Sequence, residues 1–184
     1  MRIIAGELKG RKLAFVSNEL IRPTQDRVRE SVFNIIAAFV PGKKVLDLYA
    51  GTGAYGIEAI SRGAVQSVFV DKNEISCKLI GDNLNSLNIK EKGKIIKDDC
   101  LRAIKRINDR KQKFDIVFLD PPYQKGLSKK TLIKLIQYDI MSHNNIIIME
   151  YGAEDSLPEH IEGVKLLKKR KFSEKLVSFY TKTI

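Results

Sequence analysis

Cysteine and histidine are scarce in this chain of 184 residues, which contains two of each. Cys77 falls on an expected helix and Cys100 just after an expected strand, so the cysteine spacing does not suggest a disulfide framework. His143 and His160 are scattered in the sequence, and with the two cysteines they do not form the pattern of a zinc site. We therefore expect no metal, and the cysteine usage suits a reducing cytoplasm.

Long apolar runs are also missing. No stretch approaches the length of about 20 residues that a membrane-spanning helix needs. The N-terminus, Met1–Gly6, lacks the apolar core of a signal peptide. The sequence therefore predicts a cytoplasmic protein without a membrane partner.

Acidic residues are outnumbered by basic ones. The chain has 22 Asp and Glu against 33 Lys and Arg, a formal net charge of +11. This balance favours a polyanionic partner, with nucleic acid as the leading candidate, although a lysine-rich solubilising surface would give the same count. Hydrophobic residues make up 43% of the chain, which is enough to bury the core of one domain of ordinary size.

Strands and helices are expected to alternate from residue 43 onward. The expected strands are 45–49, 67–71, 94–97, 114–119 and 146–150, and the helices between them are 54–62, 73–88, 100–109 and 128–139. An amphipathic helix, 26–39, precedes them, with Thr24 or Asp26 as its cap, and two antiparallel strands, 163–170 and 175–183, follow. The pattern predicts an α/β fold, a parallel sheet covered by helices on both faces, with an antiparallel edge.

The first residues predict a small basic hairpin in which 2–5 pair with 12–16. Such a hairpin is marginal in isolation, so it must pack on the domain or on a partner. The sequence leaves open whether it covers the core or serves as a basic finger for RNA. We divide the chain into this extension, residues 1–20, and a main domain, residues 21–184.

A glycine-rich loop joins the first buried strand to a helix and matches G-x-G-x-x-G at Gly51, Gly53 and Gly56. The glycines let the backbone approach a ligand, and the helix N-terminus attracts an anion. Asp47 beside this loop would repel a pyrophosphate but would hold a cationic ligand. S-adenosyl-L-methionine fits, because its sulfonium and ammonium groups are cationic. A dinucleotide-dependent oxidoreductase is a more distant alternative.

Acids also end the next two strands. Asp71 lies about 20 residues after Gly51, where an acid hydrogen-bonds ribose hydroxyls in nucleotide-binding folds. Asp99 and Cys100 follow the third strand, where they could contact the edge of an adenine ring. The alternative for both Asp71 and Asp99 is that they cap the helices that follow them.

The apolar run 114–119 ends in Asp120-Pro121-Pro122-Tyr123, which we interpret as the reactive centre. The carboxyl ends of parallel strands are where α/β sheets bind ligands. Asp120 can accept a hydrogen bond from a substrate amino group, and the Pro121 carbonyl can accept a second. The two prolines fix the loop, and Tyr123 can stack on a flipped base. A simple turn after a strand is the alternative.

Cations near the N-terminus are the candidate phosphate contacts: Arg2, Lys9, Arg11, Lys12, Arg22, Arg27 and Arg29. Arginines at the start of a helix oppose its dipole, at a cost of about 0.3–1 kcal/mol each, which suggests a bound anion. Salt bridges to Asp26 and Glu30 are the alternative. We expect the RNA to be single-stranded or unpaired at its target.

These motifs resemble a known family. Asp47–Gly56, Asp71, Asp99 and Asp120–Tyr123 are similar to the class I S-adenosylmethionine-dependent methyltransferases with a D-P-P-Y motif, which methylate exocyclic amino groups. More narrowly, the chain resembles the RsmD-type family. The segments that carry this resemblance are Met1–Gly6 with Lys9–Arg11, Arg22–Thr24 with Asp26–Glu30, and Ser61–Ala64, and the resemblance extends to Ser178–Tyr180.

The resemblance implies a Rossmann-like fold with a mostly parallel seven-stranded sheet, an antiparallel C-terminal edge strand and an N-terminal β-hairpin extension. It also implies methylation of a guanine N2 amino group in bacterial 16S rRNA, either naked or in an assembling small ribosomal subunit. We expect a monomer that uses S-adenosyl-L-methionine and no metal.

The chain departs from the family pattern in four places. Tyr49 stands where phenylalanine is more frequent, Asp98 replaces a glycine, Met141–Asn145 lacks paired glycines, and Phe172–Glu174 replaces a tyrosine-glycine-acid turn. The alternatives are methylation of adenine N6, cytosine N4 or a protein glutamine, and a non-catalytic RNA-binding domain. The intact Asp120 and glycine loop argue against the last.

Overall fold

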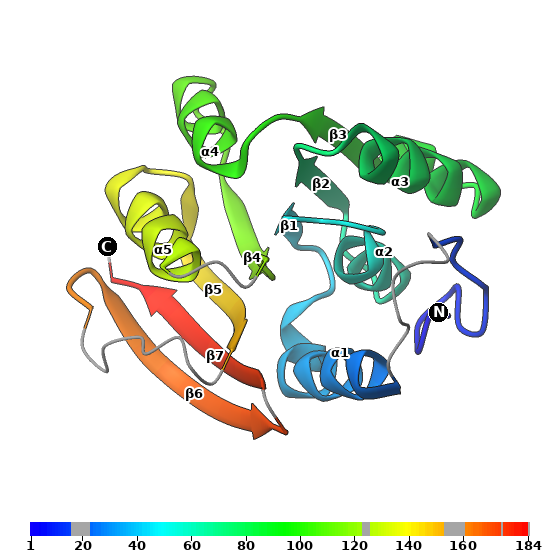
Figure 1. Ribbon diagram of the computed structural model, residues 1–184, viewed down its shortest axis with the longest axis horizontal. Helices are drawn as coiled ribbons and strands as arrows, with labels where there is room; N and C mark the ends of the chain where they lie inside the picture. Colours follow the sequence, from blue (N-terminus) through cyan, green and yellow to red (C-terminus); the bar gives the residue numbers. More distant parts are fainter. Residues whose placement is uncertain (16–22, 123–125, 153–160, 174, 184) are drawn as a thin grey trace.

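The computed structural model describes all residues except 16–22, 123–125, 153–160, 174 and 184. Seven strands form one sheet in the order β3-β2-β1-β4-β5-β7-β6 (Figure 1). The strands are β1 (Lys44–Leu48), β2 (Gln66–Asp71), β3 (Gly93–Lys97), β4 (Phe114–Leu119), β5 (Met141–Gly152), β6 (Val164–Phe172) and β7 (Lys175–Lys182). The helices are α1 (Pro23–Ile36), α2 (Ala54–Ser61), α3 (Glu74–Ser86), α4 (Cys100–Asp109) and α5 (Leu127–Gln137), with short 3-10 turns η1 (Ala37–Phe39) and η2 (Lys90–Lys92).

The five strands β1 to β5 run parallel, and β7 is antiparallel both to β5 and to β6. The predicted class, a mostly parallel sheet with an antiparallel C-terminal edge, is confirmed. Within that edge the last strand, β7, lies inside the sheet against β5, and β6 forms the rim. The strand order reverses between β1 and β4, and such a reversal opens a crevice at the carboxyl ends of the two strands.

Helices cover both faces of the sheet, as the repeated strand–helix pattern predicts. On one face α4 and α5 bury Ile104 and Leu132 against strand residues such as Leu48 and Leu119. On the other face α1 packs against β1, β4 and β5, and α2 and α3 pack against β2. Every β1 residue after Lys44 is buried, because this strand sits in the middle of the sheet.

The first helix differs from its prediction at its N-terminus. Helix α1 begins at Pro23 rather than at residue 26, so Thr24 and Asp26 lie inside the helix and the prediction that one of them caps it is wrong. Proline suits the first helical position, because its ring fixes φ near the helical value and its missing N–H would be unpaired there. Asp26 lies in the first turn, where its negative charge interacts favourably with the positive end of the helix dipole.

Strand β5 is longer than predicted and begins at Met141 instead of residue 146. Its register against β4 shifts between Phe114 and Ile116, which absorbs the extra residues 142–145. Asn145 is buried there, and its side chain bonds the Ser142 carbonyl and the Lys182 backbone. The segment Met141–Asn145, which lacks the paired glycines of the family pattern, is therefore an irregular start of a strand, fixed by an asparagine.

The N-terminal residues form a compact finger, which we define as residues 1–13, rather than two paired strands. Arg2 and Lys12 form an antiparallel bridge in this finger, and the backbones of Ile3 and Arg11 also bond across it. Ile3 and Leu13 are buried in the same cluster as Ile57. This packing agrees with the interpretation that the finger covers the core. The boundary at residue 20 stays a prediction, because it falls outside the described residues.

Candidate active site

A cavity of about 690 Å³ opens at the carboxyl ends of the central strands. Most of the residues predicted to bind a cofactor or to carry the reaction line it: Asp47, Gly51, Asp71, Asp99, Cys100, Asp120, Pro121 and Pro122. These residues come from the carboxyl ends of four different strands or from the segments that follow them, and parallel strands bring them together because their carboxyl ends share one edge. Tyr123, the last residue of the predicted reactive centre, lies outside the described residues.

Asp47 is almost fully buried at the end of β1, and its Oδ2 accepts a hydrogen bond of 2.9 Å from the Gly56 backbone N–H. The pKa of Asp47 is raised to about 8, chiefly by burial; the charges of Asp120 and Asp71 contribute to the increase, and the hydrogen bond from Gly56 opposes it. Because the charged groups that act on Asp47 are the acids Asp120 and Asp71, a bound cation would favour its ionised form.

The three glycines of the loop have different roles. Gly51 lines the cavity, whereas Gly53 and Gly56 do not. Gly53 adopts a left-handed φ of 76° just before α2, a conformation that side chains disfavour. A Cβ on Gly56 would lie 2.3 Å from Cε1 of Phe69, so only glycine lets α2 pack this closely on β2. Gly53 and Gly56 therefore fix the turn and the packing of the loop outside the cavity, and Gly51 lines the cavity itself.

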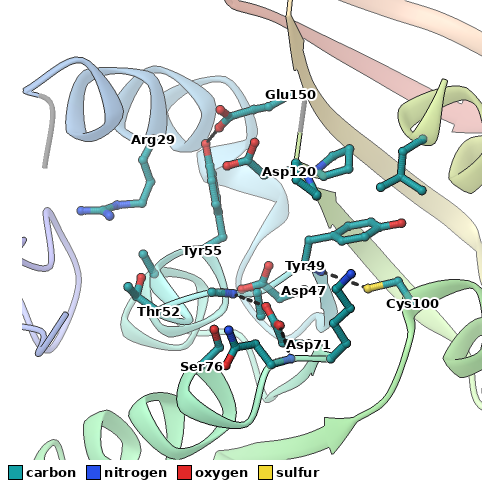
Figure 2. A pocket seen from close by; sticks show the side chains of 18 of the residues that line it. Arg29, Asp47, Tyr49, Thr52, Tyr55, Asp71, Ser76, Cys100, Asp120 and Glu150 are labelled. Carbon is teal, nitrogen blue, oxygen red and sulfur yellow. Dashed lines mark hydrogen bonds between the residues drawn. The ribbon is translucent and has the colours of Figure 1, made fainter. Parts of the chain in front are cut away.

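Asp71 ties two loops together at the end of β2. Its Oδ2 accepts from the Gly51 N–H and its Oδ1 from the Asn73 N–H, both at 2.9 Å (Figure 2). Asn73, not Asp71, caps α3, because its side chain accepts from the Ile75 N–H. The alternative that Asp71 acts as the helix cap is therefore wrong.

Asp99 does cap the helix that follows it. Its Oδ1 accepts from the backbone N–H groups of Leu101 and Arg102, at 3.0 and 3.2 Å. The capping alternative is confirmed, and Asp99 lines the cavity as well.

Cys100 is buried beside Asp99 and accepts a hydrogen bond from the Tyr49 N–H. Burial raises the pKa of the Cys100 thiol to about 12. Its thiol is neutral and supports the backbone at the end of β1.

The cavity residues that were not predicted include Tyr49, Tyr55, Glu150 and Lys175. Tyr49 has a positive φ of 61°, a strained conformation of the kind found at functional sites, and its hydroxyl bonds the Thr131 hydroxyl at 2.7 Å. The Tyr55 hydroxyl donates to Glu150, whose second oxygen accepts from Lys175 at 3.2 Å. Glu150 closes the apolar run 146–149 much as Asp120 follows the run 114–119, so the same sequence rule could have found it.

The predicted role of Arg29 as a phosphate contact requires a correction. Its side chain is only 3% exposed, and it donates to the Arg2 carbonyl at 2.6 Å and to Asp26 at 3.1 Å. The prediction that it contacts an RNA phosphate is contradicted by this burial, and its salt bridge with Asp26 agrees with the alternative. Arg29 lines the cavity instead, and its Nε has no hydrogen-bond partner among the described residues.

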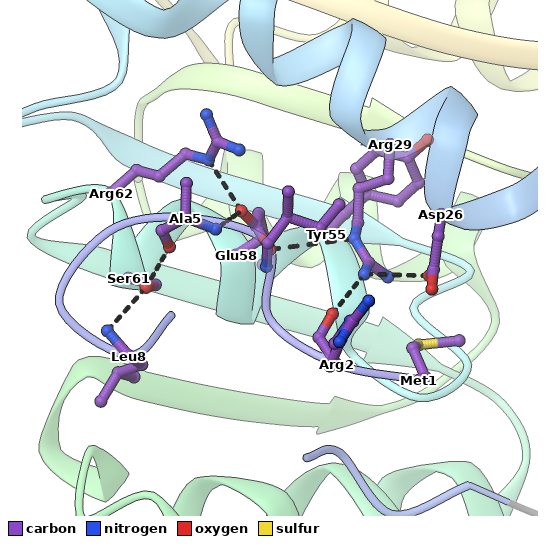
Figure 3. A network of polar contacts seen from close by, with 12 residues as sticks. Met1, Arg2, Ala5, Leu8, Asp26, Arg29, Tyr55, Glu58, Ser61 and Arg62 are labelled. Atoms are coloured by element: carbon purple, nitrogen blue, oxygen red, sulfur yellow. Dashed lines mark hydrogen bonds and ion pairs between the residues drawn. The ribbon is translucent and has the colours of Figure 1, made fainter. Parts of the chain in front are cut away.

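The finger is attached to α2 by polar contacts (Figure 3). Glu58 accepts from the backbone N–H groups of Ile4 and Ala5, and the Ser61 hydroxyl bonds the backbone of Ala5 and Leu8. A Cβ on Gly6 would lie 1.8 Å from the Ser61 carbonyl oxygen, so this approach requires glycine. These bonds fix the orientation of the finger on the domain.

The other predicted phosphate contacts lie on the surface. Exposed side chains are found at Arg2, Lys9, Arg11, Lys12 and Arg27, and Arg22 lies outside the described residues. Arg11 also donates to the Ser86 carbonyl at 3.0 Å and so helps to attach the finger to the end of α3.

Comparison with known proteins decides the family. A family profile described as "Conserved hypothetical protein 95" matches residues 1–181. Ribosomal RNA small subunit methyltransferase D of Escherichia coli (strain K12) is 32% identical over 158 residues, 86% of this chain and 78% of that protein. The chain belongs to the RsmD-type methyltransferase family.

Further relatives extend the similarity over the whole chain. The Bacillus subtilis (strain 168) protein YlbH is 35% identical over 182 residues, which cover 99% of each protein. The solved structure of the Escherichia coli methyltransferase yhhF has a TM-score of 0.87 at 28% identity, and the match covers 99% of this chain and 97% of that one. The Rossmann-like class I methyltransferase fold and the resemblance to this family are both confirmed.

Two properties of the described residues bear on other classes of function. Among the described residues, no group of three or more His, Cys, Asp or Glu side chains could hold a metal ion. None of the described helices has the length and apolar character needed to cross a membrane.

Proposed function

We propose that this protein transfers a methyl group from S-adenosyl-L-methionine to the exocyclic N2 amino group of a guanine in bacterial 16S rRNA. One observation carries the proposal: Asp120-Pro121-Pro122 shares a single cavity with Asp47, Asp71 and Asp99. The family match supports the same reaction, since curated relatives are named as small-subunit rRNA methyltransferases. The substrate is either naked rRNA or an assembling small subunit, and the protein acts as a monomer in the cytoplasm.

The residues around the cavity fit the chemistry of S-adenosyl-L-methionine. Its cationic groups would be stabilised by Asp47, its ribose hydroxyls by Asp71, and its adenine by the Asp99–Cys100 corner. Its carboxylate is complementary to Arg29, the buried guanidinium whose Nε lacks a hydrogen-bond partner in the described chain. When bound, this cofactor supplies an activated methyl group, so the reaction requires no metal.

Asp120 is the residue that acts on the target. A guanine N2 lone pair is delocalised into the ring and is a poor nucleophile. Asp120 accepts one amino hydrogen and the Pro121 carbonyl accepts the other, which aims the lone pair at the methyl carbon and stabilises the positive charge that develops on nitrogen. The new N–C bond forms as the C–S bond breaks, and the amine then loses one proton. Tyr123 stacks on the flipped base in this proposal.

The basic surface supplies the RNA contacts. Exposed cations of the finger are Arg2, Lys9, Arg11 and Lys12; Arg27 is exposed on α1, and Arg22, outside the described residues, stays in the proposed set. Lysines and arginines of this kind neutralise phosphates without reading sequence, so they orient the RNA while the cavity selects the base.

The test is transfer of a tritium-labelled methyl group to unmodified rRNA and to 30S particles, followed by identification of the methylated nucleoside by mass. The expected product is N2-methylguanosine. N6-methyladenosine or N4-methylcytidine would contradict the choice of base, and labelled glutamine in a protein would contradict the choice of macromolecule. Binding without methyl transfer to any of these substrates would support a non-catalytic RNA-binding domain.

A further inference from the structure

A second carboxylate lies beside Asp120 at the edge of the sheet. Leu119 of β4 pairs with Met149 of β5 in parallel register, so the next residues, Asp120 just after β4 and Glu150 within β5, lie side by side where this pairing ends. Both residues line the cavity, and Figure 2 shows both carboxylates close to the Tyr55 hydroxyl. The cavity therefore offers two adjacent hydrogen-bond acceptors where the target base is proposed to bind.

Glu150 is held in one orientation by groups from two other elements. Tyr55 of α2 donates to Oε1, and Lys175 of β7 donates to Oε2 at 3.2 Å. The Tyr55 ring is fixed in turn by stacking on Phe118, with centroids 4.8 Å apart and planes at 29°. Glu150 is only 4% exposed, and the Lys175 ammonium forms an ion pair with it at 3.2 Å. Because a carboxylate has about four acceptor sites, two bonds leave capacity for a ligand donor.

We infer that Glu150 accepts a hydrogen bond from the ring N1–H of the target guanine while Asp120 accepts one from its N2 amino group. This inference rests on the proposed function and explains its choice of base. Guanine carries the N1–H donor and the N2 amino donor on neighbouring atoms. Adenine and cytosine instead carry a ring-nitrogen acceptor beside their amino group, and that lone pair would face an ionised carboxylate. A site that is built to bind a donor rejects a base that lacks it.

A purely structural role is the competing explanation. Lys175 pairs with Gly152 in the sheet, so the Lys175–Glu150 ion pair also fastens β7 to β5. A fastening role predicts that changes at Glu150 lower stability and turnover for every substrate alike. A role in base selection predicts a change in the ratio between substrates that differ only at N1.

The experiment compares two RNA substrates that are identical except at the target, which is guanine in one and 2,6-diaminopurine in the other. Diaminopurine keeps the 2-amino group, but its N1 is an acceptor and an amino group replaces O6. The wild-type enzyme should favour guanine by about tenfold or more in kcat/KM. Glu150→Gln should lower this ratio by about tenfold, because its amide can donate to N1. The products are quantified as N2-methylated nucleosides by mass.

Two further variants make the result decisive. Lys182→Gln loosens the same strand at its other end, where Lys182 donates to the Tyr138 carbonyl at 2.9 Å, and it should leave the ratio unchanged. Tyr55→Phe keeps the stacked ring but removes one anchor of Glu150, so it should lower the ratio severalfold even if Glu150→Gln does not fold.

Each outcome has a defined meaning. An unchanged ratio in Glu150→Gln and Tyr55→Phe, or an equal change in Lys182→Gln, overturns the inference and assigns Glu150 to fastening β7. A wild-type enzyme that methylates N2 of guanine and diaminopurine equally well also overturns it, while the proposed function stands. A wild-type enzyme that methylates neither substrate, but transfers methyl groups to another base or to a protein, overturns the proposed function itself.

Discussion

The two halves of the cavity are built in different ways. In the first half, at the ends of β1, β2 and β3, acidic side chains accept hydrogen bonds from backbone N–H groups: Asp47 from Gly56, Asp71 from Asn73, and Asp99 from Leu101. In the second half, at the ends of β4, β5 and β7, Glu150 is held by the side chains of Tyr55 and Lys175.

The difference lies in the distance along the chain between partners. Glu150 and Tyr55 are 95 residues apart, whereas Asp99 and Leu101 are two apart. The first half is therefore formed largely by short loops that follow each strand, and the second half forms only when distant elements pack together. If the first half binds the methyl donor and the second half binds the target base, substitutions in the two halves should affect different steps.

The largest effect is expected at Asp120. Asp120→Ala should lower kcat by roughly 10³-fold, because it removes the acceptor that orients the amino group and stabilises its developing charge. The dissociation constant for S-adenosyl-L-methionine, measured by calorimetry, should remain close to the wild-type value. Asp98→Ala is the control, since Asp98 is a buried acid after β3 that pairs with Arg102 and does not line the cavity. Normal turnover in Asp120→Ala would refute the mechanism.

Asp71 should show the reverse pattern. Asp71→Ala removes a carboxylate that holds the Gly51 loop and would bind the ribose, so the Kd for S-adenosyl-L-methionine should increase by about 10–100-fold. At saturating cofactor kcat should recover. Asp115→Ala is a matched control, because Asp115 also accepts a backbone N–H bond, from Lys44, at the opposite end of the sheet. An equal loss of cofactor affinity in both variants would contradict the role of Asp71 in binding.

Asp47 should make cofactor binding depend on pH. Its pKa of about 8 means that the carboxyl is protonated at neutral pH in the free protein, and a bound cation favours the ionised form. The affinity for S-adenosyl-L-methionine should therefore increase with pH, by up to about tenfold per unit, until about pH 8. Asp47→Asn should abolish this dependence, and calorimetry over pH 6–9 would measure it. A wild-type affinity that is independent of pH would count against this prediction.

The same carboxyl has a consequence for stability. Its pKa is raised on folding, so the folded chain binds more protons than the unfolded chain between about pH 4 and pH 8. The contribution of Asp47 to the free energy of unfolding should therefore decrease as pH rises through this range. Asp47→Asn should remove that part of the pH dependence in denaturant unfolding of the ligand-free protein.

The smallest effect is expected on the finger. Lys9→Ala with Lys12→Ala should weaken RNA binding and reduce the slope of log K against log salt by roughly 0.7–0.9 per lost phosphate contact. Arg11 is left intact because it anchors the finger on Ser86. Lys105→Ala with Arg110→Ala removes the same charge from exposed positions near α4 and is the control. Equal slopes in the two double variants would assign the finger to covering the core.

Predictions from the sequence succeeded where structure depends on near neighbours. Helix α4 and strand β4 were predicted with their observed ends, because Asp99 caps the helix and an uninterrupted apolar run defines the strand. The acids at strand ends were found because parallel strands must gather their carboxyl ends at one edge. The start of α1 was predicted wrongly, because Pro23 was treated as preceding the helix rather than as its first residue.

The sequence by itself determined the fold class, the glycine loop, the row of acids and the position of Asp120, because strand alternation and local capping follow from residues that lie close together in the chain. Only the tertiary structure decided that Arg29 is buried, that β7 lies between β5 and β6 in the sheet, and that Tyr55 and Lys175 hold Glu150 beside Asp120. These features depend on contacts between distant segments, which no local pattern encodes.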